Sequence, residues 1–204
     1  MKVFVTGGAG FVGNNTIDKL VKKGHSVRAM VRNPEKGKLR LGHYSSDEVE
    51  LVQGDVTDRD GLPDLVSGCD AVVHTVAISM EKNGNTYEEI NFQGTVNMVD
   101  AAEKAGVERF INISQNGADS SLPYRFLASK GKAQEYVAMQ DDLKWTAIRP
   151  SAIFGPQDEF FNTFARLVKL TPVVFPLIGG GKAQFQPVSI FDVAEATVRS
   201  IEDD

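Results

Sequence analysis

Residues 121–137, SLPYRFLASKGKAQEYV, carry a phenol and an amine that could exchange protons, those of Tyr124 and Lys130. A helical pattern covers most of this stretch, and four helical residues advance by about 400°, which brings side chains four apart onto one face. The residue four before Lys130 is Phe126, whose ring has no proton to give. Tyr124 is six before Lys130, about 240° away on a helix. Whether the stretch serves catalysis depends on what surrounds it.

Glycines recur in the stretch VTGGAGFVG, between an apolar run and a helical pattern. Glycine lets the backbone turn tightly and approach a pyrophosphate, and the last glycine lets helix and strand pack closely. The following helix N-terminus offers free N–H groups to phosphates. A plain glycine-rich turn is the alternative, and the strand–glycine–helix order favours a dinucleotide site. The expected contact residues are Thr6, Gly7, Gly10, Phe11, Val12 and Gly13.

The next apolar run ends at AMVRNP, which places Arg32 and Asn33 at the expected strand end. A cofactor with a free ribose 2′-hydroxyl favours an acidic residue about twenty positions after the glycines. Here the first acid is Glu35, whereas a guanidinium matches a phosphate dianion and can stack on adenine. A solvated arginine at a strand end is the alternative. The missing acid and the present base favour NADP(H) over NAD(H).

Short apolar runs alternate with stretches of helical period along most of the chain. Continuous apolar strands separated by helices predict an α/β fold, a doubly wound parallel sheet of the Rossmann type. The predicted strands are 2–6, 26–31, 49–53, 71–76, 109–113 and 146–149. The predicted helices are 11–23, 58–67, 86–105 and 125–140, and 33–48 is predicted as a loop with at most a short helix.

After Pro150 the pattern changes to one typical of a small C-terminal lobe. We expect one domain over 1–204, with 150–204 contributing a small substrate lobe whose completeness the sequence leaves open. The expected order is a helix at 158–169, the proline-flanked TPVVFP, a GGG loop, a strand near 184–189 and a helix from Asp192.

The composition argues against several classes of function. Net charge is −5 and the basic residues are scattered, so we expect no nucleic-acid partner. The histidines His25, His43 and His74 lack ligand spacing, so we expect no metal site. The single cysteine, Cys69, excludes an internal disulfide and fits a reducing compartment. The apolar run at the first residues is too short for a signal peptide or a membrane span, so we expect a cytoplasmic location.

Seven short motifs occur in a fixed order along the chain. They are TGGAGFVG, VRNP, GDVTD (54–58), AVVHTVA (71–77), NFQGT (91–95), RPSAIFGP (149–156) and QPVSIFDVAEA (186–196). With these motifs the chain resembles an atypical short-chain dehydrogenase/reductase of the extended type, in the NAD-dependent epimerase/dehydratase superfamily. It is most similar to the branch that contains the nucleotide-binding accessory subunit of respiratory complex I. The resemblance covers essentially the whole chain.

The resemblance also implies which residues complete the nicotinamide dinucleotide site. In the family, residues after the third strand flank the adenine, residues ending the fourth strand line the ribose and pyrophosphate side, and residues after the sixth strand border the nicotinamide carboxamide. The matching residues are, in that order, Asp55 and Val56; Thr75, Val76 and Ala77; and Pro150, Ser151 and Ile153.

The same resemblance implies the catalytic positions and one departure from them. The family places a catalytic serine at Ser114 and, at Lys130, the lysine that holds the nicotinamide ribose; a turn or capping role for Ser114 is the alternative. Its proton donor is a tyrosine four residues before that lysine, with a pKa lowered by the ammonium and the oxidised nicotinamide. Phe126 occupies that position here. The proton relay is therefore broken, rerouted through Tyr124, or replaced by Ser114 and water.

Three functions follow from these residues, and the sequence leaves open whether the protein is an enzyme. The favoured one is an NADP(H)-binding protein with weak or absent oxidoreductase activity, with a small molecule or a protein as a further partner. The alternative is an active NADPH-dependent reductase of a small carbonyl that uses Ser114, Lys130 and Tyr124. The third, a nucleotide-sugar epimerase or dehydratase, depends on the missing tyrosine. Neither a substrate nor an oligomeric state is predicted.

Overall fold

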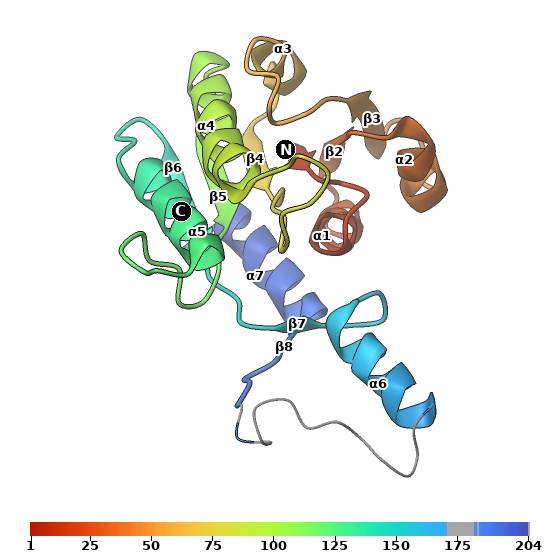
Figure 1. The fold of residues 1–204 in the computed structure, drawn as a ribbon. Coiled ribbons are helices and arrows are strands. Elements are labelled where there is room, and N and C mark those ends of the chain that lie inside the picture. The colour runs from red at the N-terminus through yellow and green to blue at the C-terminus, as the bar shows by residue number, and fades with distance from the viewer. Residues whose placement is uncertain (171–181, 183, 204) are drawn as a thin grey trace.

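The computed structural model describes residues 1–170, 182 and 184–203, and its centre is a six-stranded parallel sheet (Figure 1). The strands lie in the order β3-β2-β1-β4-β5-β6, and each pairs with its neighbours in parallel. Their bounds are Lys2–Thr6 (β1), Ser26–Val31 (β2), Val49–Gln53 (β3), Ala71–His74 (β4), Arg109–Ile113 (β5) and Lys144–Ile148 (β6). The predicted doubly wound sheet is confirmed.

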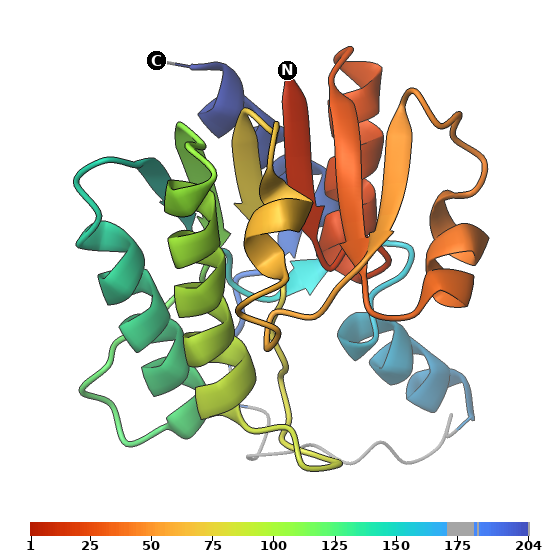
Figure 2. The same ribbon diagram turned by 90° about the horizontal axis from the view of Figure 1, so that it is seen from above.

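Helices cover both faces of this sheet (Figure 2). Successive strand residues point to opposite faces, so Phe4 packs against α3 and α4 while Val3 and Val5 pack against α1 and α7. Both faces are buried, which is why the strands read as continuous apolar runs. The helices are α1 (Phe11–Lys22), α2 (Pro34–Leu41), α3 (Leu62–Val66), η1 and α4 (Glu88–Gln93 and Gly94–Lys104), α5 (Arg125–Ala138) and α7 (Ile190–Glu202).

The strand order reverses between β1 and β4, because β2 lies on one side of β1 and β4 on the other. The connections after β1 and β4 therefore leave the sheet in opposite directions. In doubly wound folds, ligands bind in the crevice outside the carboxyl ends of the strands at such a point. The topology alone predicts where a site must lie.

Some elements differ from their predicted bounds for local reasons. The 33–48 segment holds an eight-residue helix, α2, because the Asn33 side chain caps the N–H of Lys36 at 3.0 Å and a proline follows Asn33. The helix predicted at 58–67 is only α3, because Asp58 accepts a hydrogen bond from the N–H of Gly61 and holds that segment in a turn.

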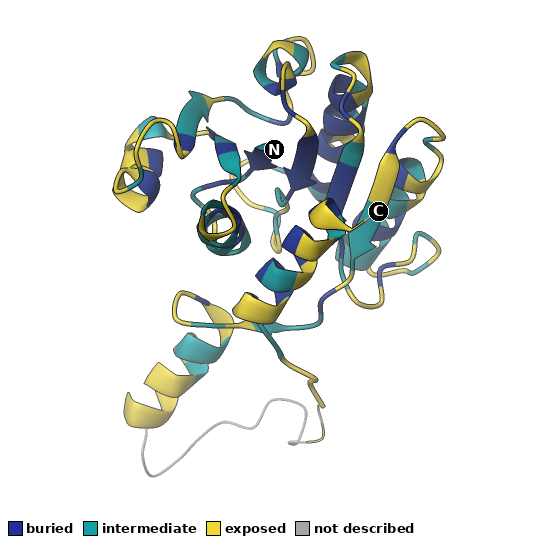
Figure 3. Cartoon of the chain, turned by 180° about the vertical axis from the view of Figure 1, so that it is seen from behind, coloured by how far each residue is buried: buried dark blue, intermediate teal, exposed yellow. Residues whose placement is uncertain are grey.

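The C-terminal part divides between the main sheet and a smaller unit. The last helix, α7, begins at Ile190, two residues earlier than predicted, and packs on α1 with Val198 and Ile201 in the core. The smaller unit contains a two-stranded sheet, in which β7 (Ile153–Phe154) pairs with β8 (Val188–Ser189). It also contains α6 (Phe160–Leu170), which has no buried residue (Figure 3). The strand expected near 184–189 is reduced to β8. The predicted TPVVFP segment and GGG loop lie outside the described residues.

Cys69 is a free, buried thiol in the core cluster that also contains Phe4 and Val72. Within residues 1–170, 182 and 184–203, no group of three His, Cys, Asp or Glu could hold a metal ion. In the same ranges, no helix is both long and apolar enough to span a bilayer.

A chain of buried hydrogen bonds crosses the sheet face that carries α4 and α5. The His74 ring contacts the Thr6 hydroxyl through Nδ1 at 3.1 Å and the Thr95 hydroxyl through Nε2 at 3.2 Å. Thr95 donates to the carbonyl of Asn91 at 2.8 Å, so it accepts from His74 and Nε2 carries the proton. The Asn91 amide donates in turn to the hydroxyl of Ser129 on α5 at 3.2 Å.

The first member of this chain also ends strand β4. The Thr6 hydroxyl accepts hydrogen bonds from the backbone N–H groups of Thr75 at 2.9 Å and Val76 at 3.4 Å. Those two N–H groups are thereby taken out of the sheet ladder, so β4 stops at His74 rather than at the predicted Val76. The chain thus fixes the segment that follows β4 and ties it to α5.

The chain requires a neutral imidazole. His74 is fully buried, and burial, helped by the positive charge of Lys130, lowers its pKa to about 3. In the unfolded chain the pKa of histidine is about 6.5. Below that pH the unfolded chain binds a proton that the native protein does not, so the free energy of unfolding falls as pH drops from about 6.5 toward 3.

We therefore expect His74→Gln to flatten the pH dependence of stability. In the wild type this histidine should remove about 2 kcal/mol of unfolding free energy between pH 7 and 5, with a slope that approaches about 1.36 kcal/mol per pH unit below pH 6. The variant should be less stable at pH 7 but should lose less on acidification. Urea unfolding followed by circular dichroism at pH 7, 6 and 5 measures this, with the exposed His43→Gln as the control. Equal slopes for wild type and His74→Gln would contradict the assignment.

Candidate functional site

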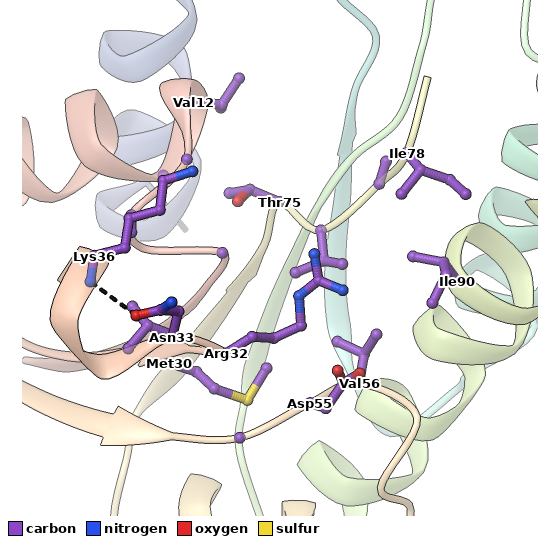
Figure 4. Close-up of a pocket in the computed structure, with 18 of the residues that line it drawn as sticks. Val12, Met30, Arg32, Asn33, Lys36, Asp55, Val56, Thr75, Ile78 and Ile90 are labelled. Atoms are coloured by element: carbon purple, nitrogen blue, oxygen red, sulfur yellow. Dashed lines mark hydrogen bonds between the residues drawn. The ribbon is translucent and has the colours of Figure 1, made fainter. Parts of the chain in front are cut away.

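A cleft of about 390 Å³ opens at the carboxyl ends of the first four strands, at the topological reversal (Figure 4). Its walls come from the loop between β1 and α1, the end of β2 with the start of α2, the segment after β3, and the segment after β4. The lining residues are Gly7, Ala9, Gly10, Phe11, Val12, Gly13, Met30, Val31, Arg32, Asn33, Lys36, Gly54, Asp55, Val56, Thr75, Val76, Ala77, Ile78 and Ile90.

The glycine loop forms one wall, and two of its glycines are required by geometry. Gly7 has a φ of 66°, a left-handed conformation that glycine adopts without strain. A Cβ on Gly13 would lie 2.4 Å from the carbonyl oxygen of Gly7, so only glycine lets α1 start this close to the end of β1. Gly10 caps α1 without a side chain, which leaves the first N–H groups of the helix directed at the cleft.

Two basic side chains stand at the opposite wall. Arg32 extends into the middle of the cleft, and Lys36, from the first turn of α2, extends toward Val12 (Figure 4). Neither forms an ion pair with a carboxylate of the described residues. Lys36 was not predicted from the sequence. The signal that could have found it is the Asn-Pro pair before it, which starts a helix and brings Lys36 round to the cleft.

Arg28, the other arginine of β2, does not reach the cleft. Its guanidinium donates to Glu50 at 2.9 Å and to the carbonyl oxygens of Leu65 and Ser67 at 2.9 and 2.8 Å. It therefore ties β2 to β3 and to the end of α3. Of the two arginines on this strand, Arg32 is the one free to meet a ligand.

The remaining walls are formed by residues predicted to face an adenine and a ribose. The Thr75 hydroxyl donates to the backbone oxygen of Thr6 at 2.6 Å, which holds the segment after β4 against β1. Asp55 accepts from the N–H and the hydroxyl of Thr57, both at 3.0 Å, so its carboxylate is held in a turn. Thr6 itself is fully buried beneath the cleft and supports it from below. The unpredicted Ile78 and Ile90 close the far end.

Ser114 directly follows β5, the Lys130 ammonium bonds to the last residue of β5, and neither residue lines the cleft. Lys130 is 3% exposed, and its ammonium donates to the backbone oxygen of Ile113 at 2.6 Å. Burial lowers the pKa of Lys130 to about 8. Ser114 is also 3% exposed, and its hydroxyl donates to the side-chain oxygen of Gln134 at 2.9 Å. Both groups have protein partners.

The two aromatic residues of the opening stretch lie apart from this pair. Tyr124 is the N-terminal cap residue of α5 and is 66% exposed. The Phe126 ring packs edge-on against Tyr87, with 5.7 Å between the ring centroids. The Tyr87 hydroxyl donates to the backbone oxygen of Ser79 at 2.9 Å. The structure thus brings no tyrosine hydroxyl of the described residues into hydrogen-bond contact with Lys130 or Ser114.

The residues expected at the nicotinamide carboxamide follow β6 and also lie outside the cleft. The Pro150 carbonyl accepts from the N–H of Asn116 at 2.8 Å. The Ser151 hydroxyl donates to the backbone oxygen of Gln186. Ile153 belongs to β7 and pairs with Val188. Ser151 lines a second hollow that shares no lining residue with the first.

Comparison with known proteins places the chain among nicotinamide nucleotide proteins. Residues 7–204 match a family model described as NAD(P)H-binding. The chain is 35% identical over 197 residues to 3 beta-hydroxysteroid dehydrogenase/Delta 5→4-isomerase of Mycobacterium tuberculosis, covering 82% of this chain and 52% of that protein. It is 30% identical over 202 residues to NADH dehydrogenase (ubiquinone) 1 alpha subcomplex subunit 9, mitochondrial, of Arabidopsis thaliana, covering 98% and 50%.

Solved structures agree on the fold. A UDP-glucose 4-epimerase from Thermotoga maritima superposes with a TM-score of 0.81 at 21% identity, covering 99% of this chain and 74% of that one. The chain spans about half the length of the curated relatives it matches. The glycine loop, the cleft at the β1–β4 reversal and these matches lead to one assignment. The chain belongs to the NAD(P)H-binding family and has its Rossmann-type fold, with sequence relatives that include a hydroxysteroid dehydrogenase and a complex I subunit.

Proposed function

We propose that this protein binds NADP(H) and that its own oxidoreductase activity is weak or absent. One observation carries the proposal: Lys130 is buried on the Ile113 carbonyl, and the residue four before it on α5 is Phe126. Carbonyl reduction needs a proton as well as a hydride, and the side chain at this position has none to give. Loss of a general acid typically costs about 10²–10⁴ in rate.

The surroundings of Lys130 support this reading. A buried ammonium needs its hydrogen-bond acceptor, because an unpaired buried charge is strongly unfavourable. Moving the Lys130 ammonium away from Ile113 would break their hydrogen bond, and turning the Ser114 hydroxyl proton to a substrate would break its bond to Gln134. Lys130 and Ser114, the groups that the family uses for catalysis, therefore stabilise the packing of α5 on β5 in this structure.

The choice of NADP(H) over NAD(H) rests on the two basic residues of the cleft. A 2′-phosphate dianion needs cations to offset its desolvation, and Arg32 and Lys36 both line the wall at the end of β2. An acid that would bind a free ribose 2′-hydroxyl is absent from the end of this strand, where Arg32 and Asn33 stand. When bound, the nucleotide would supply hydride chemistry; this chain supplies the phosphate contacts.

Replacing Arg32 by alanine should weaken NADPH binding about 10-fold or more, since hydrogen bonds to charged groups contribute about 1.5–3 kcal/mol. NADH, which lacks the 2′-phosphate, should bind to the variant nearly as it does to the wild type. Isothermal titration calorimetry measures both, with Arg40→Ala, an exposed arginine on α2 outside the cleft, as the control. An equal loss for the two nucleotides would mean that Arg32 stacks on adenine and does not bind the phosphate.

Phe126→Tyr should leave turnover at the wild-type level and NADPH affinity unchanged. The variant adds a phenol beside Tyr87, and we expect Lys130 to stay on the Ile113 carbonyl rather than turn to that phenol. Stopped-flow measurement of NADPH oxidation with a panel of small carbonyls tests this. A rise of about 10² or more would show a reductase lacking only its acid. Turnover by the wild type that Lys130→Ala abolishes would equally overturn the proposal.

A second candidate, an active NADPH-dependent carbonyl reductase, is supported by the 35% identity to a hydroxysteroid dehydrogenase. It would use Ser114 and Lys130 after rearrangement, with Tyr124, the cap residue of α5, as a tyrosine donor. The unit of β7, α6 and β8 within 150–204 would be its substrate lobe. A nucleotide-sugar epimerase or dehydratase ranks third, because it shares the fold but needs the missing tyrosine. A protein partner is suggested by the complex I relative. A cytoplasmic location remains part of this proposal, although that relative is mitochondrial.

A further inference from the structure

The polar groups at one end of the expected dinucleotide site face the cleft, whereas those at the other end are hydrogen-bonded to the protein. At the adenosine end, the glycine loop, Arg32 and Lys36 all face the cleft. At the nicotinamide end, Lys130, Ser114 and Ser151 donate to protein acceptors. We propose that the cleft recognises the 2′-phospho-ADP-ribose part of the nucleotide and gives the nicotinamide ring little binding energy, so that NADP⁺ and NADPH bind alike. This inference rests on the proposed function and names the ligand class of the same site.

The lining of the cleft supports this division. Every wall comes from segments between β1 and α4, and the far end is closed by Ile78 and Ile90. No residue of β5, α5 or the segment 149–156 is part of the described lining. A ligand held here contacts the half of the sheet that binds adenosine and pyrophosphate in doubly wound folds.

The hydrogen-bond donors at the nicotinamide end already have protein acceptors. Lys130 and Ser114 are both 3% exposed and each donates to a protein acceptor, so moving the bonded donor of either residue to a ligand would leave that acceptor unsatisfied. The Ser151 hydroxyl is directed at Gln186 and lines a separate hollow. A nicotinamide ring above these groups would compete with Gln134 and Gln186 for the hydroxyl protons of Ser114 and Ser151.

The positive charges of the site also lie at its adenosine end. Arg32 and Lys36 and the N-terminus of α1 are the positive features of the cleft, and Asp55 is the one carboxylate of the described lining. Three phosphate groups at the adenosine end match this arrangement. NADP⁺ and NADPH differ only in the nicotinamide ring, away from these groups. The bound fraction should therefore report the total amount of nucleotide and not its redox state.

Isothermal titration of the full chain with four probes tests this. The probes are NADP⁺, NADPH, 2′-phosphoadenosine 5′-diphosphoribose, which lacks only the nicotinamide ring, and ADP-ribose, which also lacks the 2′-phosphate. We expect the first three to bind within about threefold of one another and ADP-ribose at least about tenfold more weakly. Lys36→Ala should weaken the first three equally. Lys38→Ala, on the same helix but outside the cleft and paired with Glu35, is the control.

The outcomes separate this inference from the proposed function. NADP⁺ or NADPH binding at least tenfold more tightly than 2′-phosphoadenosine 5′-diphosphoribose would show that the nicotinamide ring is held, and would overturn the inference while leaving the proposed function intact. A tenfold difference between NADP⁺ and NADPH would do the same. If none of the four probes binds to the wild type, both the proposed function and this inference fail.

Discussion

The neutral His74 ring is the constraint on which the rest of the structure depends. It stands in a chain with defined donors and acceptors, from Thr6 on β1 through Thr95 and Asn91 to Ser129 on α5. Since each buried group has its partner, no member can move without leaving a polar atom unsatisfied. The chain therefore fixes the cleft wall after β4 and the helix that carries Lys130 in one arrangement.

That arrangement underlies the proposed separation of nucleotide binding from catalysis. The cleft wall is positioned by Thr6, which takes the N–H groups of Thr75 and Val76 out of the sheet ladder. On the other side of the chain, α5 sets Lys130 onto the Ile113 carbonyl and the Phe126 ring against Tyr87. Under the proposed function, a nucleotide binds between these walls while both contacts stay in place.

The sequence predicted the sheet and much of the cleft, because those depend on local patterns. Strands 2–6 and 109–113 can be recognised as continuous apolar runs because both faces of the sheet are buried. The glycine loop can be recognised by its place between a strand and a helix. Lys36 was missed because its position depends on the cap that Asn33 forms. The burial of Lys130 and Ser114 was not predictable either, because their partners Ile113 and Gln134 are set by the packing of α5 on β5.

The most direct measurement is a crystal structure of the wild-type protein with NADPH, refined well enough to place the lysine side chains. This account predicts that Arg32 and Lys36 contact the 2′-phosphate, while the Lys130 ammonium stays on the Ile113 carbonyl and the Phe126 ring stays against Tyr87. A structure in which Lys130 has left Ile113 and binds the hydroxyls of the nicotinamide ribose would contradict it, since the family's catalytic geometry would then be intact apart from one phenol.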